Sequence, residues 1–432
     1  MERYNEYKDS GVQWLGEIPS HWGLRKMKYT FCERSQKGFP NEPLLAATQS
    51  HGVILKSQYE TRTVEATKSL ETLKLVEIGD FVISLRSFQG GLEYAHERGI
   101  ISPAYTILTP THISAEYFRY LSKSNIFISL LKSTVTGIRE GQNIDYNKLK
   151  ENLLPIPPIE EQVSIGLHLD KVISELDKAI AMQQKMIDLL NERKQIIIQN
   201  AVTKGLDGNV EMKDSGVGMI GMIPNHWKVE PFGKHFTFGK GLPITKANLQ
   251  EEGVAVISYG QIHAKNNLGT TLTESLVRYV SPKYLESHTQ CLLNQNDFIF
   301  ADTSEDIEGS GNFAFNDFEN KLFAGYHTVI ARPQDLLFPK YYAYLFKSKA
   351  WKSQIQSLVN GVKVYSIGRR ILKTSMLLIP SGDEQKHIVE LLDEKTSAIE
   401  KSIENISRQI FLLEERKQII INEVVTGKVR VS

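Results

Sequence analysis

Two stretches of the chain repeat one long pattern of apolar positions. From Leu169, these positions recur at alternating spacings of four and three over more than four heptads, and a shift of 223 residues without a gap returns the pattern from Leu392. Such heptads predict one helix over residues 158–203 and another over 381–426. The apolar seam residues are Leu169, Ile173, Leu176, Ile180, Ile187, Leu190 and Ile197, then Leu392, Ile399, Ile403, Ile406, Ile410, Leu413 and Ile420.

One apolar stripe alone would normally be buried against the helix's own domain. Two stripes of equal length and register are better explained by pairing with each other, as antiparallel coiled-coil helices of about 65 Å each. Such a pair would act as a spacer. Lys194 and Lys417 occupy corresponding seam positions, where a polar residue can set the register. We expect instead that the seam frays there and that both lysines reach solvent.

The segments that precede the two helices also repeat each other. Residues 7–22 and 212–227 share Lys-Asp-Ser-Gly-Val, a central glycine, Ile-Pro and His-Trp. His21 and His226 have no nucleophile or base in this motif, so we expect each His-Trp pair to anchor the lead-in by packing. A mixed segment follows each lead-in, with short β-rich runs at 79–85 and 104–110 and again at 296–302 and 327–333.

This order predicts an α+β protein in which two mixed α/β heads alternate with two long helices, related by a pseudo-two-fold axis. The first head with its lead-in would span residues 1–157, and the first spacer helix 158–205. The second head with its lead-in would span 206–380, and the second spacer helix 381–432.

Composition limits the classes of function. The 51 basic and 50 acidic residues give a net charge of +1, which neither indicates nor excludes a polyanion partner. No run of eighteen apolar residues indicates a membrane span, the N-terminus lacks an apolar signal region, and the only cysteines are Cys32 and Cys291. We therefore expect a cytoplasmic protein with no membrane partner, no disulfide frame and no metal site.

The duplicated order resembles the specificity subunits of type I restriction-modification systems, in which two target-recognition domains alternate with two long helices. The resemblance covers nearly the entire chain. It rests on the lead-ins, the Gly-Asp-Phe-Val-Ile-Ser strand, the connectors that end in Glu161-Gln162 and Glu384-Gln385, and the Glu-Arg-Lys-Gln-Ile-Ile repeats near the helix ends. The second connector has Pro380-Ser381 where the first has Pro157-Pro158, which affects only its local turn.

This resemblance implies a non-catalytic subunit, active in host defence, that recognises a bipartite, asymmetric sequence in double-stranded DNA. Each head would bind one part of the target, and the helices would fix the gap between the parts. The implied partners are two modification subunits, which bind S-adenosylmethionine and methylate adenine, and restriction subunits, which use ATP and Mg²⁺. No cofactor is expected on this chain.

The residues agree with a non-catalytic role. The sequence contains no Gly-x4-Gly-Lys-Ser/Thr phosphate loop, no Asn/Asp-Pro-Pro-Tyr/Phe motif of adenine methylation and no paired His/Cys metal spacing. Gly309-Ser310-Gly311 is a short turn with no helix pattern after it. Two alternatives remain: the recognition subunit of a related modification system outside type I, and a coiled-coil scaffold whose heads bind proteins.

Side chains suited to phosphates and base edges gather at corresponding places in the two heads. The candidates in the first head are Arg86, Ser87 and Gln89 after a predicted strand, and Arg139, Gln142 and Asn143 in a glycine-centred turn. Those in the second head are Thr303, Lys363, Tyr365, Arg369 and Arg370 in matching places, with Lys240, Lys246 and Lys265 as phosphate contacts. The acidic cluster at 302–306 can read cytosine or hold a cation, although a solvated loop is the simpler interpretation. Residue types alone do not encode the target sequence, because readout also depends on docking geometry and DNA shape.

Overall fold

The computed structural model describes residues 2–58, 69–85, 87–136, 143–334, 336–359, 361 and 364–431. The chain divides into two compact units, of which the first comprises Met1–Gln184 with Ile406–Ser432 and the second Lys185–Asn405. Each unit holds one head and a segment of each long helix. We call the heads head one (residues 2–157) and head two (residues 206–380). The units therefore group the chain differently from the four consecutive segments suggested by the sequence.

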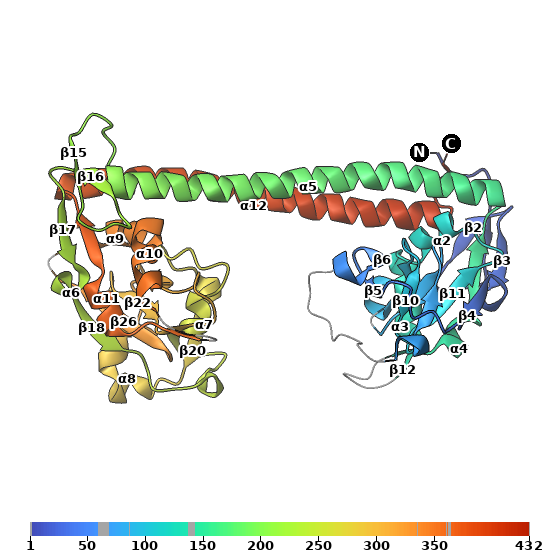
Figure 1. Ribbon diagram of the computed structural model, residues 1–432, viewed down its shortest axis with the longest axis horizontal. Coiled ribbons are helices and arrows are strands. Elements are labelled where there is room, and N and C mark those ends of the chain that lie inside the picture. The colour runs from blue at the N-terminus through green and yellow to red at the C-terminus, as the bar shows by residue number, and fades with distance from the viewer. Residues whose placement is uncertain are drawn as a thin grey trace. The chain divides into compact units, whose positions relative to one another are not determined.

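The two long helices are α5 (Ile159–Lys204) and α12 (Gly382–Val425) (Figure 1). The predicted seam positions are all buried or half-buried along both helices. In the first unit, Lys417 Nζ lies 2.6 Å from Asp177 Oδ1, and Gln183 Nε2 donates to Gln409 Oε1 at 3.1 Å. Asp177 precedes Gln183 in α5, whereas its partner Lys417 follows Gln409 in α12. The two segments therefore pair antiparallel.

The prediction that the seam lysines reach solvent is wrong. In the second unit, the Lys194 side chain is only 16% exposed, and its ammonium lies 3.5 Å from Glu400 Oε1 of the facing helix. Lys417 makes the matching pair with Asp177 in the first unit. Each lysine thus forms an ion pair across the helices, which favours one register of pairing over its neighbours.

The ends of both helices also pack into the heads. Ile165, Leu169 and Ile173 of α5 and Ile421, Val424 and Val425 of α12 join the core of head one. Ile198, Ala201 and Val202 of α5 and Ile388 and Leu392 of α12 join the core of head two. Gly166 permits close packing, because a Cβ there would lie 2.7 Å from Glu116 Cβ in α2 (Ala115–Leu121). The apolar stripe of each helix therefore packs against a head near the helix ends. Between the ends, it pairs with the other long helix.

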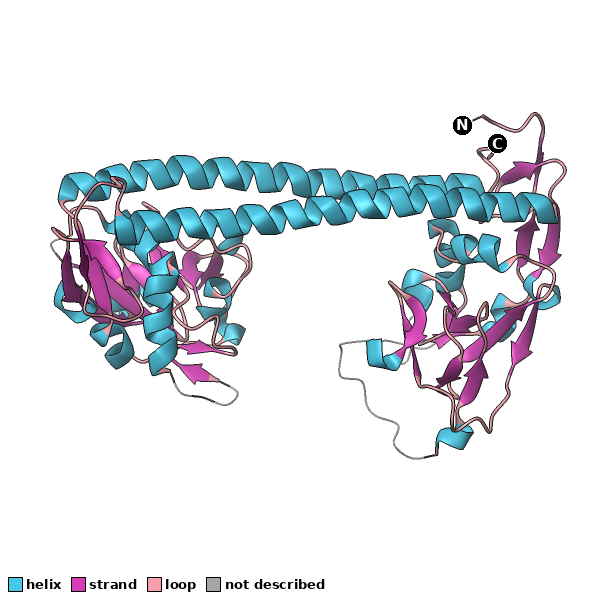
Figure 2. Cartoon of the chain, turned by 45° about the horizontal axis from the view of Figure 1, so that its top comes forward, coloured by secondary structure: helices cyan, strands magenta, loops and turns pink. Residues whose placement is uncertain are grey.

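Each head is built on a four-stranded antiparallel sheet, and the strand order is the same in both. The strands are magenta in Figure 2. In head one the order is β4 (Phe31–Arg34), β11 (Thr106–Pro110), β8 (Phe81–Ile83) and β9 (Glu93–Tyr94). In head two it is β18 (Phe236–Lys240), β26 (Thr328–Pro333), β22 (Phe298–Ala301) and β24 (Phe313–Phe315). All four β-rich runs predicted from the sequence are confirmed as the central strands of these sheets. Strands β8 and β22 are buried throughout, as expected for strands with both faces covered.

A second set of strands is also shared. Head one has β5 (Leu45–Thr48) paired with β6 (Gly52–Leu55), and β7 (Lys74–Val76) paired with β10 (Gly99–Ile101). Head two joins the corresponding strands into one sheet, β20 (Arg278–Val280), β19 (Val254–Ile257), β25 (Leu322–Ala324) and β21 (Leu292–Leu293). The parallel β19–β25 pair of head two has its counterpart in head one as a parallel bridge from Leu44 to Ile100. The repeat is thus carried by the fold where the sequence shows it only faintly.

The lead-ins are matching hairpins, β1 (Tyr7–Asp9) with β2 (Glu17–Pro19) and β15 (Met212–Asp214) with β16 (Met222–Pro224). After each hairpin a fully buried indole, of Trp22 or Trp227, donates at 3.0 Å to Glu161 or Glu384 respectively. His21 and His226 bind the same carboxylates at 2.8 and 2.9 Å. The prediction that His-Trp anchors the lead-in is confirmed, and its partner is the glutamate in the first turn of a long helix.

The remaining elements complete this shared plan. The lead-ins continue as β3 (Gly23–Lys26) and β17 (Lys228–Pro231), which pair with the connectors β14 (Leu153–Ile156) and β28 (Met376–Ile379). The helices of the heads are α1 (Ser87–Gly90), α2, α3 (Asn125–Ser133), α4 (Tyr146–Leu149), α6 (Phe232–His235), α7 (Tyr259–Ile262), α8 (Tyr284–Ser287), α9 (Pro339–Lys347), α10 (Lys349–Leu358) and α11 (Arg369–Thr374). Within the described ranges, none of the helices has the length and apolar character that crossing a bilayer requires.

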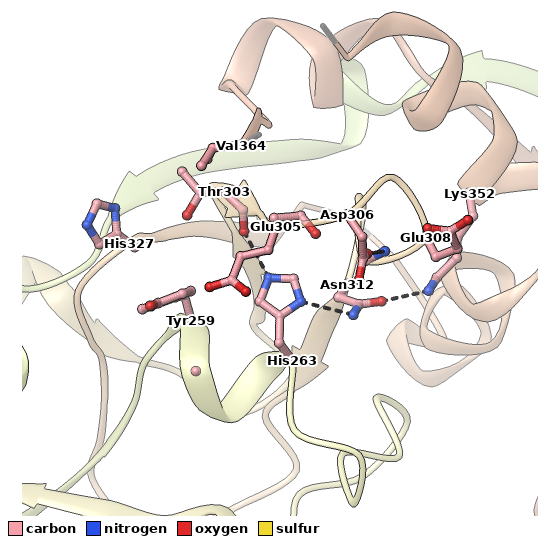
Figure 3. Close-up of a pocket in the computed structure, with 13 residues that line it drawn as sticks. Tyr259, His263, Thr303, Glu305, Asp306, Glu308, Asn312, His327, Lys352 and Val364 are labelled. Atoms are coloured by element: carbon pink, nitrogen blue, oxygen red, sulfur yellow. Dashed lines mark hydrogen bonds between the residues drawn. The ribbon is translucent and has the colours of Figure 1, made fainter. Parts of the chain in front are cut away.

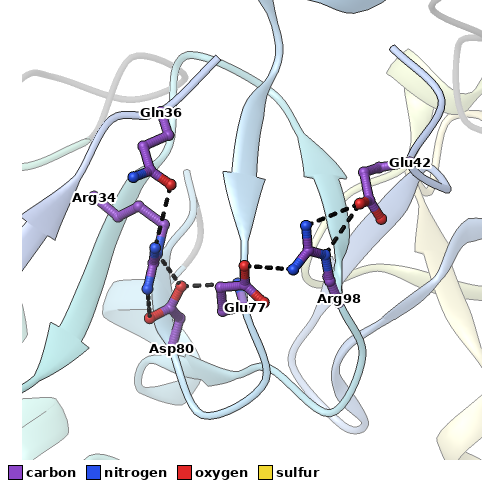
Figure 4. A network of polar contacts seen from close by, with 6 residues as sticks. All are labelled: Arg34, Gln36, Glu42, Glu77, Asp80 and Arg98. Carbon is purple, nitrogen blue, oxygen red and sulfur yellow. Dashed lines mark hydrogen bonds and ion pairs between the residues drawn. The ribbon is translucent and has the colours of Figure 1, made fainter. Parts of the chain in front are cut away.

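An aspartate precedes the central strand in both heads, but its surroundings differ. Asp80 accepts from Arg34 Nε at 2.7 Å and from the Glu77 amide at 2.9 Å (Figure 4). It also accepts from Thr109 Oγ1 at 2.7 Å. Asp297 accepts from the Asn294 amide at 2.8 Å, but Arg332 Nε lies 3.7 Å away. Burial therefore dominates and raises the pKa of Asp297 to about 6.

This difference predicts opposite effects of removing the charge. Because the folded pKa of Asp297 is raised, the native state keeps a proton that the unfolded chain releases, and stability from this group falls as pH rises from about 4 to about 6. The asparagine of Asp297→Asn does not titrate, so the free energy of unfolding of this variant should rise relative to that of the parent chain as pH increases across that window. Asp80→Asn should lose about 2–4 kcal/mol at neutral pH, because Arg34 loses its carboxylate. Urea unfolding of both variants between pH 4 and 7 measures this, and equal profiles would contradict it.

Candidate functional site

A cavity of head two lies just beyond the end of β22 and has a volume of about 870 Å³ (Figure 3). Its walls come from α7, from the acidic stretch after β22, from α10 and from Val364. Within the described chain, no group of three His, Cys, Asp or Glu residues is arranged to hold a metal ion.

Two short strands bring distant parts of the sequence to this cavity. β23 (Thr303–Ser304) pairs antiparallel with β27 (Tyr365–Ser366), so that Thr303 faces Ser366 and Ser304 faces Tyr365. Thr303 lines the cavity, and the residue before Tyr365, Val364, lines it as well. The fold thus brings the acidic stretch at 302–306 next to the segment that follows the glycine-centred turn. The sequence predicts DNA contacts in both segments.

A chain of hydrogen bonds crosses the cavity. Lys352 Nζ donates to Asn312 Oδ1 at 2.7 Å. The amide nitrogen of Asn312 in turn donates to His263 Nδ1 at 3.2 Å. His263 Nε2 then donates to the Thr303 carbonyl at 2.8 Å. Both ring nitrogens are used, so His263 positions β23 and is not free to act as a base.

The floor of the cavity requires a glycine. A Cβ on Gly309 would lie 2.5 Å from Ser304 Oγ and 3.2 Å from His263 Cε1. The Gly309 amide donates to Asp306 Oδ1 at 2.6 Å and shapes the turn that carries the acidic residues. Strand β24, and not a helix, follows Gly309-Ser310-Gly311, so the turn has no helix N-terminus of the kind that holds a nucleotide phosphate.

Charge is unevenly distributed around the opening. Glu305, Asp306 and Glu308 are exposed along one wall. Lys352 lies beside Glu308 (Figure 3), and burial lowers its pKa even though the field of Asp306 acts to raise it. Exposed carboxylates accept hydrogen bonds from amino groups such as the exocyclic amine of cytosine, but they repel phosphates.

Aromatic rings form the remaining wall. Tyr259 contacts the rings of Tyr326 and His327 edge-on, with centroids 5.6 and 5.5 Å apart. His327 is exposed, binds Asp302 at 3.2 Å and has φ of 53°, in the left-handed region that non-glycine residues rarely adopt. Such backbone strain is concentrated at ligand-binding sites. Carboxylates, a hydroxyl and exposed aromatic rings together suit the edge and face of a base.

At the corresponding place in head one, Ser87 points into the core, and the prediction that it projects toward a ligand is wrong. Ser87 is fully buried, and its hydroxyl donates at 2.6 Å to Glu93, which is itself buried. Burial raises the pKa of the Glu93 carboxyl. Gln89 is exposed and accepts from Gln49 at 3.3 Å. Asn143 is exposed on β13 (Asn143–Ile144), which pairs with β12 (Val135–Thr136).

Of the other predicted DNA contacts, some lie outside the described residues and others lie in head two. Arg86, Arg139, Gln142 and Lys363 lie outside the described residues. Lys240, Lys246 and Lys265 are exposed in head two, and Arg369 and Arg370 begin α11 with Arg370 exposed. The roles of these residues in binding remain predictions. Sequence reasoning missed Tyr259, His263, Asn312, His327 and Lys352, because single residues of these types carry no local signal until the fold brings them together.

Comparisons with known proteins add to this geometry. The family model described as a type I restriction modification DNA specificity domain matches residues 224–408. The chain is 25% identical over 446 residues to a protein of Methanocaldococcus jannaschii provisionally assigned as the type I restriction enzyme MjaX specificity subunit, covering 96% of each chain. It is also 25% identical over 363 residues to the MjaVIII specificity subunit of the same organism, covering 83% of this chain and 80% of that one.

The fold is shared with a solved chain from a type I restriction-modification complex. The TM-score is 0.69 at 13% identity, and the match covers 95% of this chain and 99% of the other. At this level of identity the likeness concerns the fold alone.

Proposed function

We infer that this chain, which belongs to the family of type I restriction-modification specificity subunits, selects the DNA sequence on which a larger complex acts. The single observation that carries the proposal is a duplicated scaffold with unlike surfaces. Both heads share one strand order, yet the residues after the central strand differ: those of head two line an acidic cavity, whereas Ser87 of head one is buried against Glu93. Each head would therefore bind a different part of a bipartite, asymmetric target.

The long helices are proposed to fix the gap between those parts. Each is a single unbroken element, of 46 residues in α5 and 44 in α12. Each contributes to both compact units, and inside each unit the helix segments are joined by an ion pair. A paired helix resists bending better than an irregular linker, which supports a fixed spacing.

The helices also carry exposed apolar residues in repeated positions. Leu189 and Ile196 of α5, in the second unit, are 50% and 52% exposed. Leu412 and Ile419 of α12, in the first unit, occupy the same places in the repeat and are 52% and 49% exposed. Apolar residues seven apart on the outer face of a helix favour docking of another helix. One such pair per unit suits two copies of a modification subunit.

The reactions themselves are assigned to those partners. We propose that modification subunits bring S-adenosylmethionine and that restriction subunits bring ATP and Mg²⁺, whereas this chain supplies the choice of sequence. The fixed hydrogen bonds of His263 support a recognition role for head two.

The proposal predicts sequence-selective DNA binding by the chain assembled with modification subunits. Selection from a randomised duplex pool should enrich one bipartite sequence, bound about 10³-fold or more tightly than unrelated DNA. The logarithm of affinity should fall steeply with the logarithm of salt concentration, with a slope of about −0.9 per phosphate contacted.

A matched variant sharpens this test. Glu305→Gln, at an exposed position of the head-two cavity, should alter preference in one part of the target and leave the other part unchanged. Enrichment of no sequence would overturn the proposal. Binding of partner proteins without any DNA affinity would favour a scaffold instead.

A further inference from the structure

A second, smaller cavity in head two gathers positive charge. It has a volume of about 220 Å³, and its lining includes Lys265, Lys347 and Lys352 but no carboxylate. His263, Asn312 and Lys352 line both this cavity and the larger one described above. The two cavities therefore adjoin, one rich in lysine and the other rich in acid.

Lys347 is half-buried, and among the described residues its ammonium has no hydrogen-bond or ion-pair partner. Burial lowers the pKa of Lys347 to about 8, and Lys352 and Lys194 add to this effect. The field of Glu400 acts to raise the pKa, but that carboxylate already lies 3.5 Å from Lys194. A partly desolvated ammonium without a partner lowers stability unless an anion joins it.

The equivalent lysine of head one is satisfied by the protein. Tyr120-Leu-Ser-Lys123-Ser124 and Tyr344-Leu-Phe-Lys347-Ser348 occupy the same place in the two halves. Lys123 Nζ donates to the Gly90 carbonyl at 2.8 Å and lies 3.4 Å from the Gln49 carbonyl. The repeat thus retains the lysine in both heads but supplies acceptors for it in only one.

We propose that the lysine cavity of head two binds a phosphate group, with Lys347 and Lys352 as its principal contacts and Lys265 at its rim. This inference rests on the proposed function and deepens it, because the natural source of the group is the DNA backbone beside the base edge that the acidic cavity would read. A phosphate presents several acceptor oxygens, which suit ammonium donors converging from different elements. Free phosphate offers the same chemistry and is the alternative source.

The test uses Lys347→Met in the full chain. The substitution removes an unpaired, half-buried charge, so thermal stability without ligand should be equal or higher. Inorganic phosphate should raise the melting temperature of the parent chain and leave that of the variant unchanged. In the assembled complex, the variant should bind all DNA sequences about tenfold more weakly, and its salt slope should be smaller by about 1.

Controls separate the possible failures. Lys349→Met removes an exposed lysine of α10 that lines neither cavity, and it should change neither measurement. Replacing single backbone phosphates by neutral methylphosphonates should reveal one position that weakens the parent chain but not Lys347→Met. If DNA is bound selectively but Lys347→Met behaves like the parent chain, the lysine cavity is refuted and the proposed function stands. If inorganic phosphate binds through Lys347 while no DNA is recognised, the cavity stands and the proposed function fails.

Discussion

Lengthening both long helices by four residues will move the preferred DNA target to one whose two parts lie one or two base pairs further apart. Insertions after Gln183 in α5 and after Ile406 in α12 add about 6 Å of helix to each, and a base pair rises about 3.4 Å. Contacts within each head are unchanged, so the two partial sequences should stay the same. Affinity for the original spacing should fall by about 10³-fold, toward the level of non-specific binding.

Target selection with the assembled complex measures this change. The matched control inserts four residues into α5 alone, which displaces its segments relative to the lysine–carboxylate pairs of α12 and should lower stability without defining a new spacing. A doubly lengthened chain that keeps the original gap would refute the spacer role of the helices.

Removing Glu161 will destabilise the first unit more than removing Glu384 destabilises the second. Glu161 accepts hydrogen bonds from Trp22, His21 and Tyr4, whereas Glu384 accepts from Trp227 and His226. Burial, reinforced by the Glu161 hydrogen bond, raises the pKa of Tyr4, so this hydroxyl stays a donor at any physiological pH. Glu161→Ala should cost about 3–4 kcal/mol and Glu384→Ala about 2 kcal/mol, because buried donors lose a charged acceptor.

Urea unfolding followed by tryptophan fluorescence reports on both sites, since Trp22 and Trp227 bind the altered groups. Glu160→Ala is the control. Glu160 is exposed beside Glu161 in the first turn of α5 and should cost only about 0.5 kcal/mol of favourable interaction with the helix dipole. Equal losses from Glu160→Ala and Glu161→Ala would refute the anchoring role.

Periodicity was sufficient for the helices, because a helix is stabilised by contacts between residues three and four apart and its pattern is local. The bounds of α5 and α12 follow the predicted stretches closely. The seam lysines show where local reasoning stops. Lys194 and Lys417 looked like points of fraying, but each meets a carboxylate of the facing helix, more than 200 residues away in the chain.

The candidate site was anticipated only in part. Thr303 and Tyr365 were chosen from separate stretches and meet through β23 and β27. Ser87 had a suitable side chain and a suitable place after a strand, yet Glu93 holds its hydroxyl in the core. Whether a polar side chain is exposed depends on which residues elsewhere in the chain pack against it. Its position at the end of a strand does not predict those contacts.

The sequence by itself therefore determined the duplication, the heptad helices, the lead-in anchors and the resemblance to a family, because these depend on local periodicity or on strings that recur in order. Only the tertiary structure decided that both heads share a strand order, that an acidic cavity opens in head two, and that Lys123 finds backbone carbonyl acceptors whereas Lys347 has none among the described residues. These features depend on burial and on contacts between residues far apart in the chain, which composition and spacing do not specify.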